Sequence, residues 1–499
     1  MLKSILSVGS FTLLSRVTGL IRDILMAAII GAGPIMDAFT VAFRLPNHFR
    51  VIFAEGAFNA AFVPNFTKIL TQEGEGAAKN FQARVLSWLV ISQVVLLIPA
   101  MIFTQQFVGL FLSDNRLQLA TELTRITFPY LFMIALVSLW GGVLNATNRF
   151  SAAAAAPILL NVSIVATLSL AFMFPTSGHA AAWGVLISGV LQAAFLGFAT
   201  QKAKLFVWPA TSQLTQNMGQ FFKSFGPAVI GSAGVQIAML ADTIIASALP
   251  TGALSSIWYA DRLYQLPVGV IAMAGGTVLL PTMSRFLANS KDALAYRAQN
   301  RIAAIILALS APCVIAFLTV PDVLLAGLFQ RQAFNAEATL AAASVLKAYG
   351  FGLPAIVLIR VALPSFQARG DTKTPMLISL CAICINIALK LVLTGEFGAA
   401  GLAFATSVGA WINLALLVFI ALKRGFMRFD YNLFWMVANC AMACLWLLAA
   451  LGLEPFIAQH TKNIAHFGKE IRMVIIGLVG MIVYLGVFGL GMKILRLKP

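Results

Sequence analysis

Apolar runs of helix length recur from one end of this 499-residue chain to the other. The chain is 60% hydrophobic and 10% charged, and its mean hydropathy of +0.91 lies outside the soluble globular range. A helix that crosses a bilayer needs roughly 20 apolar residues, and the sequence contains about 14 such segments. The sequence therefore predicts an all-α integral membrane protein. The segments cover residues 5–31, 35–67, 82–105, 119–147, 152–174, 180–202, 218–249, 252–284, 299–320, 334–367, 374–395, 399–422, 431–453 and 471–494.

The basic residues predict how the chain is oriented in the membrane. The net charge is +17, and alternate loops carry most of the lysine and arginine. Cytoplasmic loops of membrane proteins are enriched in these residues, so we expect the basic loops and both termini on the cytoplasmic side. This bias accounts for the positive charge without a nucleic-acid partner.

An internal repeat predicts two lobes. Three pairs of similar segments share an offset of roughly 220 residues in the same direction, which indicates a parallel repeat of two six-helix lobes. We expect an N-lobe over residues 1–204, an amphipathic connector over 205–217, a C-lobe over 218–424 and a C-terminal helix pair over 425–499. The pairs are Arg44-Leu45 before Pro64 with Arg262-Leu263 before Pro281, Leu144–Ala146 before Pro157 with Phe366–Ala368 before Pro375, and Gly184–Ser188 with Ala403–Ser407.

The first two apolar segments contain ionisable side chains where a membrane helix is normally apolar. Each costs roughly 2.5–3.5 kcal/mol near the bilayer centre, so such residues usually line a cavity or pathway. The arginines outnumber the carboxylates, and Arg262 adds a cation from the second lobe, so we predict a cationic central cavity for an anionic cargo. The seven residues are Arg16, Arg22, Asp23, Asp37, Arg44, Arg50 and Glu55.

These charges have two possible roles. We assign substrate binding to Arg16, Arg22, Arg50 and Arg262, because a guanidinium presents a planar, permanently charged fork that suits phosphate. The alternative is a set of structural ion pairs that fix helix packing, for which Asp23 and Glu55 are the best candidates. We assign cavity lining or gating to Asp23, Asp37, Arg44, Glu55 and Asn59.

Seven short motifs stand out along the chain: Ser15–Asp23, Asp37-Ala38-Phe39, Arg44–Asn47, Phe53–Phe58, Phe62-Val63-Pro64, Tyr259–Leu263 and Gly370–Pro375. They resemble motifs of the MurJ (MviN) family of lipid II flippases. The resemblance covers essentially the whole chain and is most specific near the N-terminus. It implies the fold of the multidrug/oligosaccharidyl-lipid/polysaccharide exporter superfamily, in a bacterial inner membrane.

The resemblance also implies a cargo and a mechanism. The cargo would be lipid II, the undecaprenyl-pyrophosphate-linked peptidoglycan precursor, moved from the cytoplasmic to the periplasmic leaflet by alternating access. The cavity arginines of the family fall on Arg16, Arg22, Arg50 and Arg262, and its second-helix aspartate falls on Asp37. Residues 425–499 would form a groove for the lipid tail. We expect a transporter, not an enzyme, that acts as a monomer in cell-wall synthesis.

Some members of the family hold a sodium ion in the second lobe. The matching positions in this chain are Asp242, Asn386, Lys390 and Thr406. Lys390 stands where a second carboxylate would help to hold the cation, so we expect an Asp242–Lys390 ion pair in place of sodium. We therefore expect no cofactor, with sodium as the disfavoured alternative because of Lys390.

Other functions stay open at this point. A flippase for another polyprenyl-pyrophosphate glycan would use the same arginines. A drug/cation antiporter of the MATE type would need a carboxylate-rich cavity, which the arginine surplus disfavours. A membrane enzyme acting on polyprenyl phosphates would need a catalytic motif beside a large loop, and every loop is short. The four histidines, His48, His179, His460 and His466, lack metal-ligand spacing.

Overall fold

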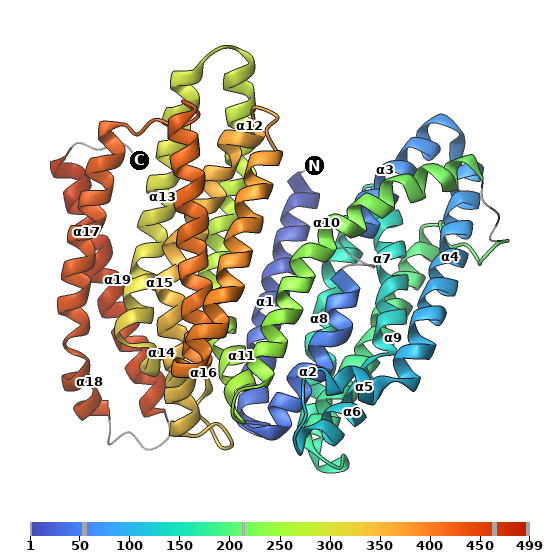
Figure 1. The fold of residues 1–499 in the computed structure, drawn as a ribbon, viewed down its shortest axis with the longest axis horizontal. Coiled ribbons are helices and arrows are strands. Elements are labelled where there is room, and N and C mark those ends of the chain that lie inside the picture. The colour runs from blue at the N-terminus through green and yellow to red at the C-terminus, as the bar shows by residue number, and fades with distance from the viewer. Residues whose placement is uncertain (1, 52–56, 212, 214, 462–466, 496–499) are drawn as a thin grey trace. The chain divides into compact units, whose positions relative to one another are not determined.

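The structure is a computed structural model that describes residues 2–51, 57–211, 213, 215–461 and 467–495. Every regular element in these ranges is a helix (Figure 1). The all-α fold class is therefore confirmed.

The described chain packs as two compact units. Unit 1 comprises Met1–Leu254 with Arg331–Phe334, and unit 2 comprises Ser255–Gln330 with Asn335–Pro499. The helix Gln216–Ser247, which the repeat assigns to the second lobe, packs on helix Ala57–Gln72 in unit 1. The lobe boundaries given by the repeat stay a prediction.

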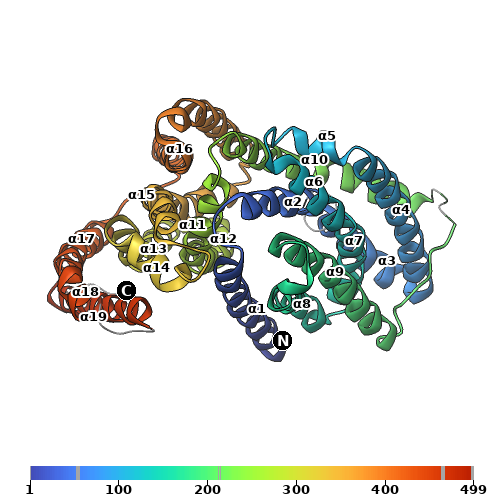
Figure 2. The ribbon, with the colours of Figure 1, turned by 90° about the horizontal axis from the view of Figure 1, so that it is seen from below.

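Neighbouring helices of unit 1 approach each other closely where a small residue lies at their contact. A Cβ atom at Gly184 would collide with Oγ1 of Thr167, so α8 and α9 can approach only because this position is glycine. Figures 1 and 2 show α1 and α9 on either side of α8. The helices are α1 (Leu2–Ile29), α2 (Pro34–Arg50), α3 (Ala57–Gln72), α4 (Gly74–Ile102), α5 (Thr104–Gly109), α6 (Arg116–Thr127), α7 (Tyr130–Ala146), α8 (Phe150–Ser169), η2 (Ala171–Met173), α9 (Ser177–Lys202) and α10 (Gln216–Ser247).

Unit 2 contains the longest helix, α16. It spans 51 residues and bends at Gly398, whose φ of 55° and ψ of −135° are not helical. The bend falls between the predicted segments 374–395 and 399–422, so two predicted spans meet there. The elements of this unit are α11 (Ala253–Pro267), η3 (Val268–Ala272), α12 (Met273–Ala288), α13 (Asp292–Thr319), α14 (Pro321–Phe329), α15 (Ala336–Gln367), α16 (Lys373–Lys423), α17 (Tyr431–Leu451), α18 (Glu454–Thr461) and α19 (Gly468–Ile494).

Nine helical segments of the described chain are long and apolar enough to cross a membrane. The protein is therefore a multi-pass membrane protein. The number of 14 spans is not confirmed. Helices α2 and α3, with 17 and 16 residues, lie on either side of residues 52–56, which are outside the described chain, and α11 and α12, with 15 and 16 residues, are joined directly by η3.

The segment between α9 and α10 contains no helix in the described residues 205–211. Its backbone is bonded to α4 instead: Nε2 of Gln82 donates to the Leu205 carbonyl at 3.1 Å, and Oγ of Ser87 donates to the Ala210 carbonyl at 2.5 Å. The predicted connector 205–217 thus ends as α10 begins at Gln216.

Residues Arg331–Phe334 follow α14 in sequence but pack in unit 1. The Ala333 amide donates to the Ala28 carbonyl at 3.2 Å, at the end of α1. Gly31 lies beside this contact with a φ of +74°, and a Cβ atom there would lie 2.5 Å from the Ala333 carbonyl oxygen. Both the backbone conformation and the close approach therefore require glycine.

Candidate functional site

Arg22 and Asp23 form a buried ion pair on α1. The Arg22 guanidinium donates to Oδ1 of Asp23 from Nη2 at 2.7 Å and from Nε at 3.0 Å. Its Nη1 donates to Oδ1 of Asn161 on α8 at 2.9 Å. The Asn161 amide in turn donates to the Ser15 carbonyl and to the Thr18 hydroxyl. Asn161 therefore ties the Arg22 side chain to both α1 and α8.

Arg16 also lies on α1, but its surroundings differ from those of Arg22. Its side chain is half-buried. Among the described residues it has no hydrogen-bond or ion-pair partner. The assignment of Arg16 to substrate binding stays a prediction.

Asp37 lies in a second buried ion pair, near the start of α2. Its side chain is fully buried, and Oδ2 accepts from Nη1 of Arg116 at 2.9 Å and from the Gly252 amide at 2.7 Å. Arg116 also donates to the Ser247 carbonyl and pairs with Asp114. The cluster joins α2, the start of α6 and the turn that follows α10.

Asp114, outside the spanning segments, forms the exposed end of this cluster. Its carboxylate accepts from the side chain and the amide of Arg116. The hydrogen bond from the Arg116 side chain holds the pKa of Asp114 below its usual value.

Other charged residues of α2 contact α10 or their own helix. Nη1 of Arg44 donates to Oγ1 of Thr243 on α10 at 3.2 Å, and Nε of Arg50 donates to Oδ1 of Asn47 at 3.0 Å. Nδ1 of His48 lies 2.8 Å from Oε1 of Gln236 on α10. Glu55 lies outside the described residues.

Asn59 lies on α3, facing α7. Its Oδ1 is buried without a hydrogen-bond partner in the described structure, and a Cβ atom at Gly142 would lie 3.0 Å from it. The assignment of Asn59 to cavity lining stays a prediction.

Arg262 belongs to unit 2. It lies on α11, with its guanidinium carbon 4.3 Å from the centre of the Trp258 ring. An arginine stacked on an indole keeps its charge and holds a defined orientation. Its convergence with Arg16, Arg22 and Arg50 of unit 1 stays a prediction.

The four positions matched to a sodium site divide between the units. Asp242 lies on α10, and the other three lie on α16. There Nδ2 of Asn386 donates to the Ala405 carbonyl across the bend, Thr406 donates to the Leu402 carbonyl, and the Lys390 side chain is buried. Nothing in the described residues groups three or more His, Cys, Asp or Glu side chains as metal ligands. The Asp242–Lys390 pair stays a prediction.

Three residues that contribute to these contacts or lie within a span were not predicted from the sequence. Asn161 is a second partner of Arg22 beside Asp23, and Arg116 is the ion-pair partner of Asp37. Neither their spacing nor their type marked them in the sequence. Arg360 is different, because it is an exposed arginine within the apolar helix α15. An arginine inside a predicted span is itself a signal for a functional site, and it could have been found.

The Gly370–Pro375 motif forms the turn between α15 and α16. Oδ1 of Asp371 accepts from the Thr374 amide at 3.0 Å, and Oδ2 accepts from Nη1 of Arg424 at 2.7 Å. The hydrogen bond from the Thr374 amide, aided by Arg424, lowers the pKa of Asp371. The motif thus stabilises the turn that connects α15 to α16.

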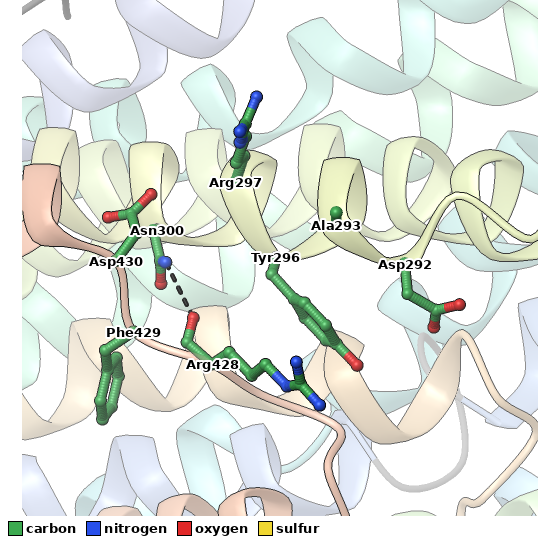
Figure 3. A pocket seen from close by; sticks show the side chains of 8 residues that line it. All are labelled: Asp292, Ala293, Tyr296, Arg297, Asn300, Arg428, Phe429 and Asp430. Atoms are coloured by element: carbon green, nitrogen blue, oxygen red, sulfur yellow. Dashed lines mark hydrogen bonds between the residues drawn. The ribbon is translucent and has the colours of Figure 1, made fainter.

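A recess of about 560 Å³ lies near this turn, between α13 and the segment that joins α16 to α17. Nδ2 of Asn300 donates to the Arg428 carbonyl at 2.9 Å (Figure 3). Figure 3 shows the Arg297 side chain pointing away from that of Arg428. The recess therefore does not bring these two guanidinium groups together on one anion.

Comparison with known families identifies the chain. Residues 26–484 match the family model described as "Lipid II flippase MurJ". The chain belongs to this family. The MurJ relative from Rhizobium meliloti (strain 1021), a probable lipid II flippase, is 38% identical over 462 residues, covering 90% of this chain and 86% of the relative. The lipid II flippase MurJ of Burkholderia cenocepacia is 35% identical, over 85% of this chain and 84% of its own. The family resemblance noted from the motifs is confirmed.

Solved structures support the MurJ fold. A structure titled "Lipid II flippase MurJ, inward closed conformation" matches with a TM-score of 0.80 at 24% identity, over 98% of this chain and 99% of that chain. An inward-facing MATE family transporter of the MOP superfamily matches with a TM-score of 0.69 at 15% identity, over 84% and 97%. The exporter-superfamily fold expected from the sequence is therefore confirmed.

Proposed function

We propose that this member of the MurJ family is a lipid II flippase, a transporter rather than an enzyme, that serves peptidoglycan synthesis and cell shape. The observation that carries the proposal is the family match over residues 26–484, together with relatives named as lipid II flippases. The arginine-rich first helices add a physical reason. A lipid-linked pyrophosphate is an anion that cannot cross hydrocarbon unshielded, and guanidinium groups bind it through paired hydrogen bonds.

Arg16, Arg22, Arg50 and Arg262 would hold the pyrophosphate. Arg22 is oriented by Asp23 and Asn161, so its guanidinium has a fixed position before cargo arrives. Arg16, which lacks a partner among the described residues, would gain its counter-charge from the cargo. Sites whose charged groups are fixed in advance lose less entropy on binding.

Alternating access would carry the bound headgroup between leaflets. The start of α2 would be held by the Asp37–Arg116 pair and by the Gly252 amide. These contacts would fix that end of the helix while the cargo site opens to one side of the membrane. The polyprenyl tail would remain in lipid along the C-terminal helices α17 and α19, which pack together and expose apolar side chains such as Leu445 and Ile482. Figures 1 and 2 show these two helices side by side.

The protein would act as a monomer in the bacterial inner membrane, with both termini in the cytoplasm and no cofactor.

The alternative function, a MATE-type antiporter, would transport a cation or an amphipathic drug. Arg16, unpaired within the described chain, and the arginine surplus of α1 and α2 disfavour such a cargo.

Genetic rescue tests the proposed function. In a strain depleted of its own lipid II flippase, the wild-type chain should restore growth, and Arg16→Ala, Arg22→Ala and Arg262→Ala should fail at normal membrane levels. The matching lysine variants keep the charge and should rescue in part. Absence of rescue by the wild-type chain at normal membrane levels would refute the function, while rescue by all three alanine variants would refute only the arginine site.

Ion coupling is tested at Lys390. If its ammonium takes the place of sodium beside Asp242, Lys390→Asp should create a sodium dependence of flipping that the wild type lacks. Lys390→Met, which removes the charge without adding a ligand, is the control. Flipping by Lys390→Asp that is equal in sodium and in potassium would contradict the expectation.

A further inference from the structure

His48 lies in the contact between α2 and α10 within unit 1. Its side chain is buried, with 6% of the residue exposed, and Nδ1 lies 2.8 Å from Oε1 of Gln236 on α10. An amide oxygen can only accept a hydrogen bond, so Nδ1 carries the proton and donates. The other ring nitrogen, Nε2, is buried without a hydrogen-bond partner among the described residues. The histidine is therefore satisfied at one nitrogen only.

This geometry suits a neutral imidazole and disfavours an imidazolium. In the neutral ring Nε2 carries a lone pair, whereas protonation would place an N–H there, away from water and without a described acceptor. Arg44, one helical turn earlier on α2, adds a charge of the same sign, and Asp242 on α10 opposes it. The described contact between α2 and α10 therefore disfavours a charged His48.

The other charged residues of the helices packed around α2 do not act on His48. Helix α7 has no charged residue, and Arg50 of α2 bonds to Asn47 on its own helix. On α6, α9 and α10, Arg116 pairs with Asp37, Glu122 pairs with His179, and Arg125, Lys202 and Lys223 are exposed. The charges that face His48 are thus those of Arg44 and Asp242.

The contact between α2 and α10 can open while each helix keeps its main neighbour. Helix α2 packs mostly on α6, and α10 packs mostly on α3. Hydrogen bonds from Arg44 to Thr243 and between His48 and Gln236 join the two helices. At the start of α2, Arg116 also donates to a carbonyl at the end of α10. An opening motion would therefore part the helices at the His48 end and leave the Arg116 end joined.

We propose that His48 binds a proton and thereby couples the contact between α2 and α10 to pH. The neutral ring holds α2 against α10 through Gln236. A proton taken from water onto Nε2 is accommodated only when the helices part and the imidazolium is hydrated. A fall in pH favours the state that binds the proton, so acid opens the contact and alkali closes it. The inference rests on the alternating access proposed above and adds a proton-binding residue to it.

Pulsed EPR between α6 and α10 tests the proposal, because α6 packs on α2 and reports its position. Spin labels are attached at Gln118→Cys on α6 and Met239→Cys on α10, both exposed, in the full-length protein with its five native cysteines replaced. At about pH 8 we expect one distance, that of the described contact. Below about pH 6.5 a second distance should appear, and its ratio to the first should rise by up to about tenfold per pH unit.

Three variants identify the group that titrates. His48→Gln keeps a donor for Gln236 but cannot be charged, so it should show the first distance at every pH. His48→Lys carries a cation and should show the second distance throughout. His179→Gln is the matched control, because it removes another histidine of unit 1 and should respond to pH as the wild type does.

Three results would overturn the proposal. They are a wild-type distance distribution that is the same at about pH 8 and about pH 5, a pH response that persists in His48→Gln, and a response that is lost in His179→Gln. The distances are measured without cargo. Their failure would therefore leave the flippase function standing, since that function is tested separately by genetic rescue.

Discussion

Replacing Arg116 by leucine is expected to destabilise the protein by about 3–5 kcal/mol, because it removes the arginine that is ion-paired with the buried Asp37 carboxylate. Asp37 is fully buried, and the Gly252 amide that also bonds it carries no net charge to replace that of Arg116. The free energy of unfolding, measured by denaturant titration of the purified protein in detergent, checks this expectation.

Two controls separate the buried charge from simple loss of packing. Asp114→Ala removes the exposed partner of Arg116 and should cost at most about 1 kcal/mol. In the double variant Arg116→Leu with Asp37→Asn, the neutral amide still accepts from Gly252, so most of the lost stability should return. If the double variant is as unstable as Arg116→Leu alone, the buried charge is not the cause.

Asn161→Leu is expected to weaken cargo binding about tenfold or more, because a hydrogen bond to a charged group is worth about 1.5–3 kcal/mol. The substitution removes the acceptor that holds Nη1 of Arg22 and both donors that tie it to α1. Asn161 would act as a positioning residue for Arg22. The dissociation constant for lipid II, measured on the purified protein, is the test.

Thr18→Val is the matched control for Asn161. It removes one of the two acceptors for the Asn161 amide without touching Arg22. It should cost about 1 kcal/mol of stability and leave the lipid II dissociation constant unchanged. If Asn161→Leu changes that constant no more than Thr18→Val does, Asn161 has only a structural role.

The helices were largely predictable from the sequence. The length of an apolar run in the sequence indicates the length of the helix. The predicted segment 334–367 therefore differs from α15 by only two residues, at its N-terminal end. The connector after α9 was harder to predict. Its backbone groups are satisfied by Gln82 and Ser87, which lie more than 100 positions earlier in the chain, and no local pattern reveals such bonds.

The site was predictable in part. Arg22 and Asp37 were marked because an ionised group in an apolar segment is costly wherever the helix lies. Asp23, the ion-pair partner of Arg22, was marked as well, but Asn161 and Arg116 were not. Arg116 is 79 positions from Asp37 and Asn161 is 139 from Arg22, and only the packing of the helices brings them together. Charge type can be read from sequence, whereas pairing depends on tertiary structure.

The four residues Arg331–Phe334 have a consequence for dividing the protein into fragments. A fragment that ends at Leu254 would contain every helix of unit 1 but would lack this inserted segment. The Ala28 carbonyl would lose its donor, and the place of the Phe334 ring, which is 1% exposed, would be empty. Split-protein designs that separate the halves between Leu254 and Ser255 should therefore reassemble only when the second fragment supplies this segment.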